Sequence, residues 1–262
     1  GLEYLNLISA QQMKMGNYQQ AEATVERMIQ LYPNHDTAWL ASASYKHLRG
    51  NLSSAINDYD RVLSFNEDHF SARLARAGLL VDLNRNEEAT QDLEVLVKAD
   101  SGDPRIHYLR SITFARAGDE HASRSELNLV INAIDGLEKE IVSRNEQLLL
   151  VAGIAHYTLG SREMARNYFE NYKEIGGADV GPLKLLATIY LEEKVYFPAV
   201  SLLESISSRV PLTVELLSLL TQAYHGAGLH EKAVDLMERA TVFDNTPEHL
   251  FTQRAITRLE AG

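Results

Sequence analysis

The stretch His225-Gly-Ala-Gly-Leu-His-Glu-Lys-Ala-Val-Asp-Leu-Met-Glu-Arg-Ala240 places a glycine, Gly228, five residues before a small residue, Ala233. Glycine suits a tight turn between two helices, because a left-handed backbone there meets no penalty from a Cβ atom. Alanine suits a position where two helix backbones pass closely. The pair therefore predicts two helices joined by a turn at the glycine.

The same pair of positions recurs along almost the whole chain. The small residues are 34 residues apart at every step except one of 42, and they are Ala21, Ala55, Ala89, Ser123, Ala165, Ala199 and Ala233. Five residues before them stand Gly16, Gly50, Asn84, Gly118, Gly160, Lys194 and Gly228. A second small set lies twelve residues before the first, at Ser9, Ala43, Ala77, Ser111, Gly153, Ala187 and Thr221. We therefore predict a repeat of two helices, A and B, which touch at the two small sets.

This pattern resembles the tetratricopeptide repeat, a 34-residue helix-turn-helix unit. The second unit matches well, with Trp39, Ala43, Gly50, Ala55 and Tyr59 in the family's order. Two turns without glycine depart from the pattern. The resemblance implies an all-α fold, specifically a right-handed superhelical α-solenoid.

One solenoid is expected over residues 1–262, as a piece of a longer chain. Its seven repeats are expected at about 2–35, 36–69, 70–103, 104–145 with an insertion, 146–179, 180–213 and 214–247. A closing helix at 248–262 is expected to cover the last repeat, because a terminal unit otherwise leaves an apolar face exposed.

The composition excludes several classes of protein. A formal net charge of −11 argues against a nucleic-acid partner, because such binding relies on clustered Lys and Arg. The chain has no cysteine, so disulfides, thiolate metal sites and a cysteine nucleophile are excluded from it. Its apolar runs are too short to span a bilayer, and its first residues do not form a signal peptide.

No catalytic motif stands out. HExxH, GxSxG and GxxxxGK[ST] are all missing from the sequence. His225 and His230 flank a turn five residues apart, which does not suit two ligands on one helical face, so a solvated turn is favoured over a metal site. We expect no enzyme activity, no cofactor and no metal.

The 42-residue step places eight extra residues near 135–145. Leu137, Ile141 and Leu148 would allow a longer helix there. Two interpretations of the insertion stay open. It either lengthens a helix or a loop, or it forms a contact with a partner or with a second copy of the chain. The first is favoured.

Since A helices line a concave groove in tetratricopeptide proteins, the resemblance also implies which side chains face a partner. They are Arg105, Tyr108, Ile112, Arg116, Leu150, Ile154, Tyr157, Lys184, Thr188, Gln222 and His225. A wall of aromatic and aliphatic groups with few basic ones suits a peptide, because apolar anchors contribute most of the affinity. The alternative that half of these residues only pack between adjacent A helices stays open.

A narrower resemblance concerns Leu74–Asn84, Tyr108–Phe114, Leu148–Gly160 and Leu185–Leu191, together with the closing Phe251–Gly262. These stretches are similar to the long tetratricopeptide lipoproteins associated with exosortase (PEP-CTERM) and exopolysaccharide systems of Gram-negative bacteria. The resemblance implies a scaffold in the periplasm or cell envelope. Its membrane attachment would be a lipid anchor before residue 1.

The expected function is therefore that of a non-catalytic protein-protein interaction scaffold, which binds a peptide or protein partner in the concave groove. The finer expectation is a role in envelope export or in exopolysaccharide or protein-sorting assembly. The alternative is a regulatory or substrate-recruiting repeat segment of a larger enzyme or secretion machine. The sequence leaves the oligomeric state open.

Overall fold

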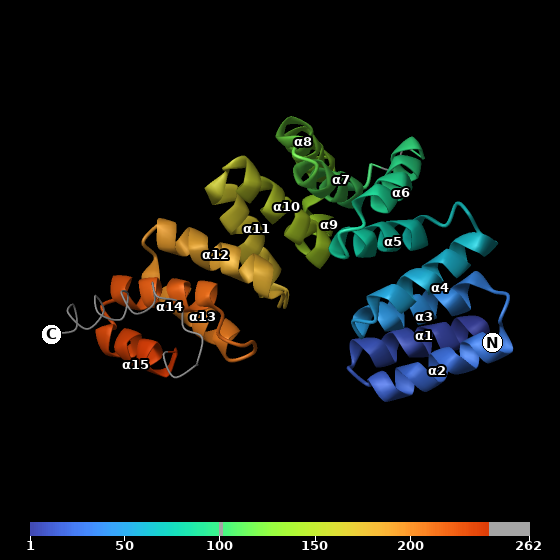
Figure 1. Cartoon of the computed structure of the whole chain (residues 1–262), viewed down its shortest axis with the longest axis horizontal. Coiled ribbons are helices and arrows are strands. Elements are labelled where there is room, and N and C mark those ends of the chain that lie inside the picture. Colours follow the sequence, from blue (N-terminus) through green and yellow to red (C-terminus); the bar gives the residue numbers. More distant parts are fainter. Residues whose placement is uncertain (100–101, 241–262) are drawn as a thin grey trace. The chain divides into compact units, whose positions relative to one another are not determined.

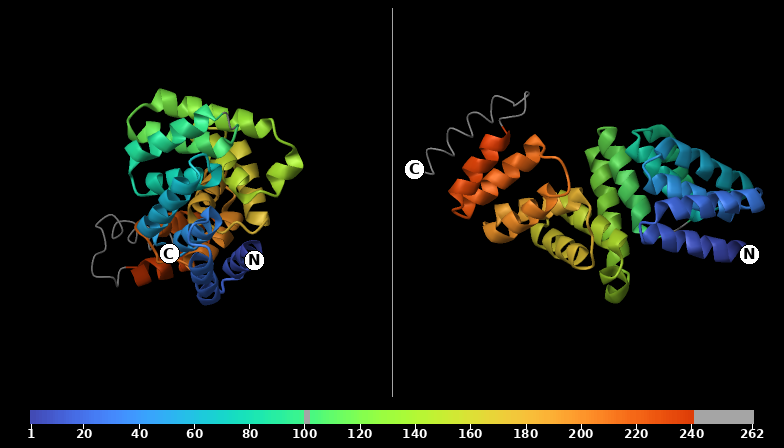
Figure 2. Two further views of the ribbon diagram at one scale, coloured as in Figure 1. Left: turned by 90° about the vertical axis from the view of Figure 1, so that its right-hand side faces the viewer. Right: turned by 90° about the horizontal axis from the view of Figure 1, so that it is seen from below.

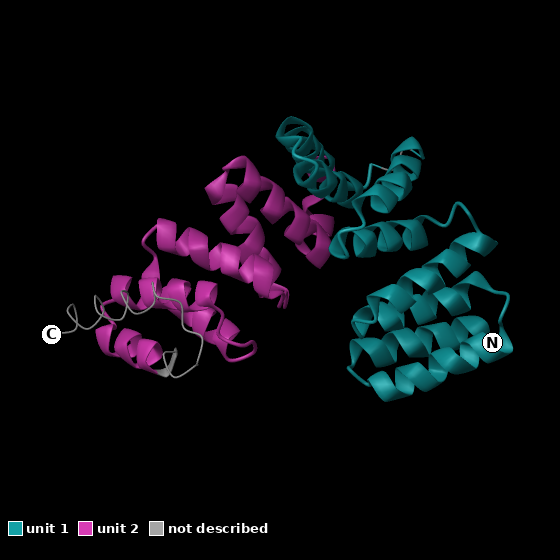
Figure 3. Cartoon of the chain, in the orientation of Figure 1, with its two compact units in different colours: residues 1–133 teal, residues 134–262 magenta. Residues whose placement is uncertain are grey.

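The computed structural model describes residues 1–99 and 102–240, and in these ranges its regular secondary structure is entirely α-helical. The chain divides into two compact units, residues 1–133 and residues 134–262 (Figure 1, Figure 3). The closing helix predicted at 248–262 lies outside the described residues. No helix within the described ranges combines the length and the apolar character that crossing a membrane requires.

Helices follow one another in pairs, each with an A helix and then a B helix. In unit 1 these are α1 (Leu2–Lys14) and α2 (Tyr18–Leu31), α3 (Asp36–Leu48) and α4 (Leu52–Phe65), α5 (Phe70–Asp82) and α6 (Asn86–Lys98), α7 (Pro104–Arg116) and α8 (Glu120–Asp135). The last two residues of α8 belong to unit 2, which continues with a short helix, α9 (Lys139–Ser143). The helix pairs of unit 2 are α10 (Glu146–Leu159) and α11 (Arg162–Glu174), α12 (Val180–Glu192) and α13 (Tyr196–Ser207), α14 (Val214–Gly226) and α15 (His230–Ala240). Figure 2 shows the pairs of each unit from two further directions.

Every turn between the two helices of a pair contains a residue in the left-handed conformation. The five glycines of the repeat have φ between 72° and 92°, and Asn84 and Lys194 have φ of 59° and 61°. A Cβ atom built on any of these glycines would have no neighbouring atom within 4 Å. The backbone conformation, and not a lack of space, therefore favours glycine at these turns.

The small residues of the repeat lie where they allow the helices to approach. The six alanines of the helix B set are fully buried, and Ser123 is 8% exposed. On helix A, Ser9, Ala43, Ala77 and Ala187 are fully buried as well. The close helix crossing predicted from these positions is present in both units.

The insertion consists of two helical parts. α8 has 16 residues, two more than α2 or α4, and a turn connects it to the five-residue α9. Val142 of α9 is 7% exposed, so this short helix is held against unit 2 by at least one buried side chain.

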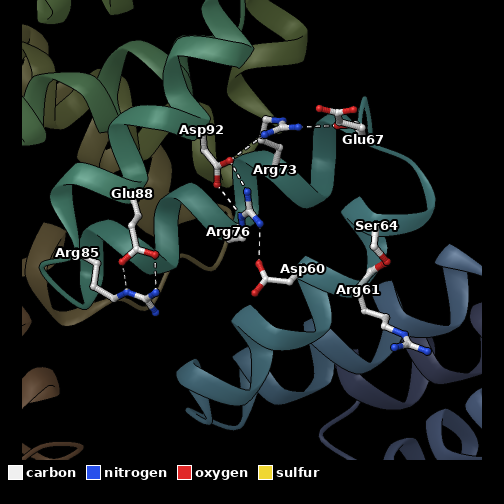
Figure 4. A network of polar contacts seen from close by, with 9 residues as sticks. All are labelled: Asp60, Arg61, Ser64, Glu67, Arg73, Arg76, Arg85, Glu88 and Asp92. Atoms are coloured by element: carbon white, nitrogen blue, oxygen red, sulfur yellow. Dashed lines mark hydrogen bonds and ion pairs between the residues drawn. The ribbon is translucent and has the colours of Figure 1, made fainter.

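A buried network of charges connects three helices of unit 1 (Figure 4). Asp92 of α6 accepts a hydrogen bond from Arg73 Nη1 at 2.9 Å, and two more from Arg76 Nε and Nη2 at 2.7 and 2.6 Å. Arg76 Nη1 also donates to Asp60 of α4 at 2.6 Å, and Arg73 Nη2 donates to the carbonyl of Glu67 at 2.6 Å. The Asp92 side chain is only 3% exposed, so the two guanidinium groups replace the water that this carboxylate has lost.

This arrangement is part of the repeat. Glu126 stands 34 residues after Asp92, and its carboxylate lies 2.9 Å from Arg110 Nη1 and 2.8 Å from His107 Nδ1. These two basic residues also stand 34 residues after the two arginines of the network. In the preceding repeat, Asp58 occupies the same place and is buried too. Three consecutive repeats therefore contain a buried carboxylate between helix A and helix B.

The left-handed turns make a prediction about stability. Lys194→Gly should stabilise the chain by about 0.5 to 1 kcal/mol, because φ at this position strains a residue that has a Cβ atom, although glycine loses more entropy on folding. Gly160→Ala, at the turn one repeat earlier, should destabilise it by about 1 kcal/mol for the same reason. Urea unfolding of the full chain measures both changes. Effects of the same sign would contradict this account of the turns.

The charge network makes a second prediction. Asp92→Ala should destabilise the chain by about 3 to 5 kcal/mol, because it leaves Arg73 buried without an ionic partner. Asp60→Ala is the matched control, since its side chain is 52% exposed and a surface pair of this kind contributes less than about 1 kcal/mol. Denaturant unfolding followed by circular dichroism compares the two variants. Equal losses would show that burial of the Asp92 carboxylate has no special importance.

Candidate functional site

Seven of the predicted partner-binding residues lie on three neighbouring A helices of unit 2. Helix α10 contacts α12, and α12 contacts α14. The seven residues are Leu150, Ile154, Tyr157, Lys184, Thr188, Gln222 and His225, and we call them the unit 2 face. Gln222 is exposed, and the other six are partly exposed. The structure thus brings this part of the predicted set together on adjacent helices.

Leu150, Ile154 and Tyr157 form the apolar part of the unit 2 face. Their spacing of four and then three residues puts them on one side of α10. The guanidinium carbon of Arg162 lies 4.0 Å from the centroid of the Tyr157 ring, and Arg162 Nη1 donates to the Tyr157 carbonyl at 2.6 Å. A cation held over the ring restricts its motion, so Tyr157 is a pre-oriented aromatic group.

Three of the four polar residues of the unit 2 face, Lys184, Thr188 and His225, have contacts within the fold. Lys184 of α12 forms an ion pair with Glu215 of α14, and Thr188 Oγ1 donates to the Lys184 carbonyl at 2.9 Å. The ring of His225 lies 5.6 Å from that of His230. Glu215 already balances the charge of Lys184. We therefore expect the apolar groups of the unit 2 face to contribute more to partner binding than this charge does.

The other four predicted residues lie on α7 of unit 1. Arg105 is at the beginning of this helix, where its guanidinium group binds both carboxylate oxygens of Asp103. Burial raises the pKa of Asp103, but the hydrogen bonds from Arg105 outweigh this effect and bring the pKa below its ordinary value. Arg105 is thus bound to the residue that caps its own helix.

Tyr108 and Ile112 are partly buried one turn apart on α7. Burial raises the pKa of the Tyr108 hydroxyl, and the nearby carboxylate of Asp82 raises it further. Ile112 packs against the apolar cluster that contains Leu80 and Val81 of α5. Of these two, Ile112 therefore contributes to packing between A helices.

Arg116, the last residue of α7, points to the preceding repeat. Its Nη1 atom donates to the Val81 carbonyl and, at 3.0 Å, to Asn86 Oδ1. Both acceptors are neutral, and Arg116 forms no ion pair within the described part of the chain. These two hydrogen bonds hold the guanidinium group of Arg116 in place, but no carboxylate among the described residues pairs with its positive charge.

The sequence did not identify a cavity that unit 2 contains between residues 134–143 and α11. The sequence analysis had located an insertion near 135–145, which overlaps the first of these segments, but it did not predict a cavity there. On α11 the cavity is lined by Met164, Asn167, Tyr168 and Asn171, which are not among the recurring positions on which the sequence analysis relied. Within residues 1–99 and 102–240, no group of three or more His, Asp or Glu residues is placed to hold a metal ion.

Two models of the tetratricopeptide repeat match the sequence, one at residues 12–68 and the other at residues 47–112. A comparison with curated proteins found no match.

Several solved structures resemble the chain. A chain of the APC/C hetero-tetramer Cut9-Hcn1 is 14% identical with a TM-score of 0.68, and the match covers 85% of this chain but 43% of that one. A tetratricopeptide repeat protein from Parabacteroides merdae is 16% identical with a TM-score of 0.52, and 98% of each chain is covered. PilW, a type IV pilus biogenesis factor, is 17% identical with a TM-score of 0.57, and the match covers 84% of this chain and 98% of PilW.

At these identities the likeness concerns the fold. The matching repeat models, the helix pairs with left-handed turns and the solved structures agree with one another. Residues 12–112 thus match models of the tetratricopeptide repeat, and the residues that the structure describes have the all-helical fold of a tetratricopeptide solenoid.

Proposed function

We propose that the chain is a protein-interaction scaffold that binds a peptide or protein partner on its A helices, and that it acts by binding and not by catalysis. The observation that carries this proposal is the unit 2 face. There α10 presents partly exposed apolar side chains, and the adjacent A helices α12 and α14 present polar ones beside them. A surface with apolar anchors and a polar surround is typical of protein interfaces.

Tyr157 is the residue that we expect to contribute most to binding. Its ring is large, partly exposed and held by Arg162, so binding would immobilise it at little further entropic cost. Leu150 and Ile154 extend the same apolar strip along α10. A partner segment with at least one large apolar side chain fits this surface.

In unit 1, Tyr108 and Arg116 would form a second contact region on α7. Tyr108 supplies an aromatic ring, and Arg116 supplies a charge that no ion pair within the described residues neutralises. An acidic or hydrogen-bond-accepting group of a partner would suit Arg116. This region differs in charge from the unit 2 face, where Lys184 is paired with Glu215.

We further propose that the protein acts in the periplasm or cell envelope, in an assembly for export, for exopolysaccharide or for protein sorting. The support comes from the stretches in four repeats that are similar to envelope lipoproteins. A second support is the similarity of fold to PilW, whose name describes a pilus biogenesis factor. The similarity to these lipoproteins also supports a lipid anchor as the means of membrane attachment.

The binding proposal predicts that Tyr157→Ala weakens the affinity for the partner by about 2 kcal/mol, or roughly 30-fold, because the variant loses its aromatic anchor. Tagged chain at a series of concentrations serves as bait in an envelope extract. Mass spectrometry then quantifies the proteins that are retained.

Phe197→Ala is the matched control. Phe197 is also an aromatic residue of unit 2, but it lies on the B helix α13 and is 68% exposed. This variant should retain the partner as the unchanged chain does. Recovery that is unaffected by Tyr157→Ala, or reduced equally by both substitutions, would exclude the unit 2 face as the binding surface.

The location proposal predicts that the full-length protein, detected with an antibody against this chain, is found in the periplasmic or membrane fraction of its own cells. Protease treatment of intact and osmotically opened cells tells the envelope from the cytoplasm. Protection from protease in opened cells would contradict an envelope location.

A further inference from the structure

The insertion, helix α11 and Leu149 of α10 line an open cavity of about 340 Å³ within unit 2, which we call the insertion pocket. Buried side chains of Val142 and Leu149 contribute to its lining, and Met164 and Tyr168 add further apolar surface. Asn167 and Asn171 supply polar groups from the same helix. The volume lies in the range of about 300 to 1,000 Å³ that is usual for ligand sites.

The insertion pocket is found where the fifth repeat departs from its neighbours. In the two preceding repeats a buried carboxylate lies between helix A and helix B, with two basic side chains bound to it. In the fifth repeat Leu149 and Ala152 stand in the two basic positions, and Tyr168 stands in the acidic one. Leu149 and Ala152 are both buried, whereas Tyr168 lines the insertion pocket, so the space lies between helix B and the insertion.

Tyr168 forms a firm wall of the insertion pocket. Its ring stacks on His156 of α10, with the centroids 5.4 Å apart and the planes 14° from parallel. His156 is 8% exposed, and its Nδ1 atom is buried without a hydrogen-bond partner. Burial lowers the pKa of His156, although the carboxylate of Asp135 acts in the opposite direction. A neutral imidazole is compatible with this apolar stacking.

Asn167 and Asn171 indicate what the insertion pocket would bind. Both are exposed, and neither side chain has a hydrogen-bond partner among the residues that the structure describes. An amide side chain both donates and accepts, as a peptide group does. Four residues of helix rise by about 6 Å, which is close to the roughly 6.6 Å that two residues of an extended chain span. The two amides therefore match two peptide groups that lie two residues apart in an extended segment and point the same way.

We propose that the insertion pocket binds an extended peptide segment, whose backbone pairs with Asn167 and Asn171 and whose large apolar side chain enters between Leu149, Met164 and Tyr168. In an extended segment alternate side chains point the same way, so one residue enters the pocket while its two neighbours face solvent. This site uses a B helix and the insertion, and it is separate from the unit 2 face on the A helices.

The test begins with a library of random 12-residue peptides displayed on phage and selected against the full chain. A selected peptide is then synthesised with an acetylated amino end, an amidated carboxyl end and a fluorescent label, and its Kd is measured by anisotropy. We expect a large apolar residue flanked by polar ones. Asn167→Ala combined with Asn171→Ala should weaken binding about 10-fold or more, because two hydrogen bonds are lost.

A second variant fills the insertion pocket directly. Ser143 lies at the pocket wall and is exposed, so Ser143→Trp should place a ring in the cavity and abolish binding. Asn57→Ala removes another exposed asparagine, from the B helix α4, and should leave the Kd unchanged. Thermal unfolding of each variant checks that the fold is intact.

Four results would overturn the proposal. The selection could yield no enriched peptide, or its peptides could bind the Ser143→Trp chain as tightly as the unchanged one. Sedimentation could instead reveal a dimer that Ser143→Trp dissociates, which would identify a second copy as the occupant. Peptides that lose affinity with Tyr157→Ala but not with Ser143→Trp would bind the unit 2 face, so the proposed function would stand while this inference failed.

Discussion

The left-handed turn between helix A and helix B is the constraint on which each helix pair depends. A residue with positive φ reverses the chain, and the small residue five positions later allows the two backbones to approach. Lys194 shows how strongly this geometry is imposed, because it has φ of 61° although a Cβ atom strains that conformation by about 1 to 2 kcal/mol. The adjacent helix α13 buries Ala199 and Leu203 completely, and burial of this extent offsets the strain.

Most of the fold could be predicted from the sequence because this constraint recurs. Seven copies of the turn and of the small positions reinforce one another, so the glycine that is missing at Asn84 does not hide the pattern. The insertion occurs once, and no periodic signal describes how α9 folds back to form a cavity with α11. The ionic partners of Lys184 and Arg105 could not be predicted either, because such pairs depend on the rotamers of long side chains at helix ends. The sequence could therefore propose the residues of the A-helix faces, but not how much of their charge the fold itself neutralises.

The same position of the repeat is stabilised in two different ways along the chain. Asp92 and Glu126 bury a carboxylate between two basic side chains in unit 1, whereas leucine stands in their place at Leu202 and Leu236 in unit 2. Replacing a buried ion pair with well-packed apolar side chains is often neutral for stability. Both solutions fill the space between helix A and helix B, so the repeat requires that the space be filled and does not dictate the chemistry.

The fifth repeat also has buried apolar side chains at these positions on helix A, Leu149 and Ala152, but its residue on helix B, Tyr168, lines the insertion pocket. The sixth repeat has leucine on both helices at the equivalent positions, at Leu186 and Leu202, and both are buried. The fifth has Ala152 and Tyr168, whose ring turns to His156, and about 340 Å³ beside it is lined but not filled by side chains. This open space has a mixed lining, because Asp135, Lys139, Asn167 and Asn171 add charged and polar groups to the apolar side chains. A chain that adds eight residues beside α11 once, and lines the resulting space with both apolar and polar side chains, has the local departure from its own repeat that is expected of a binding site.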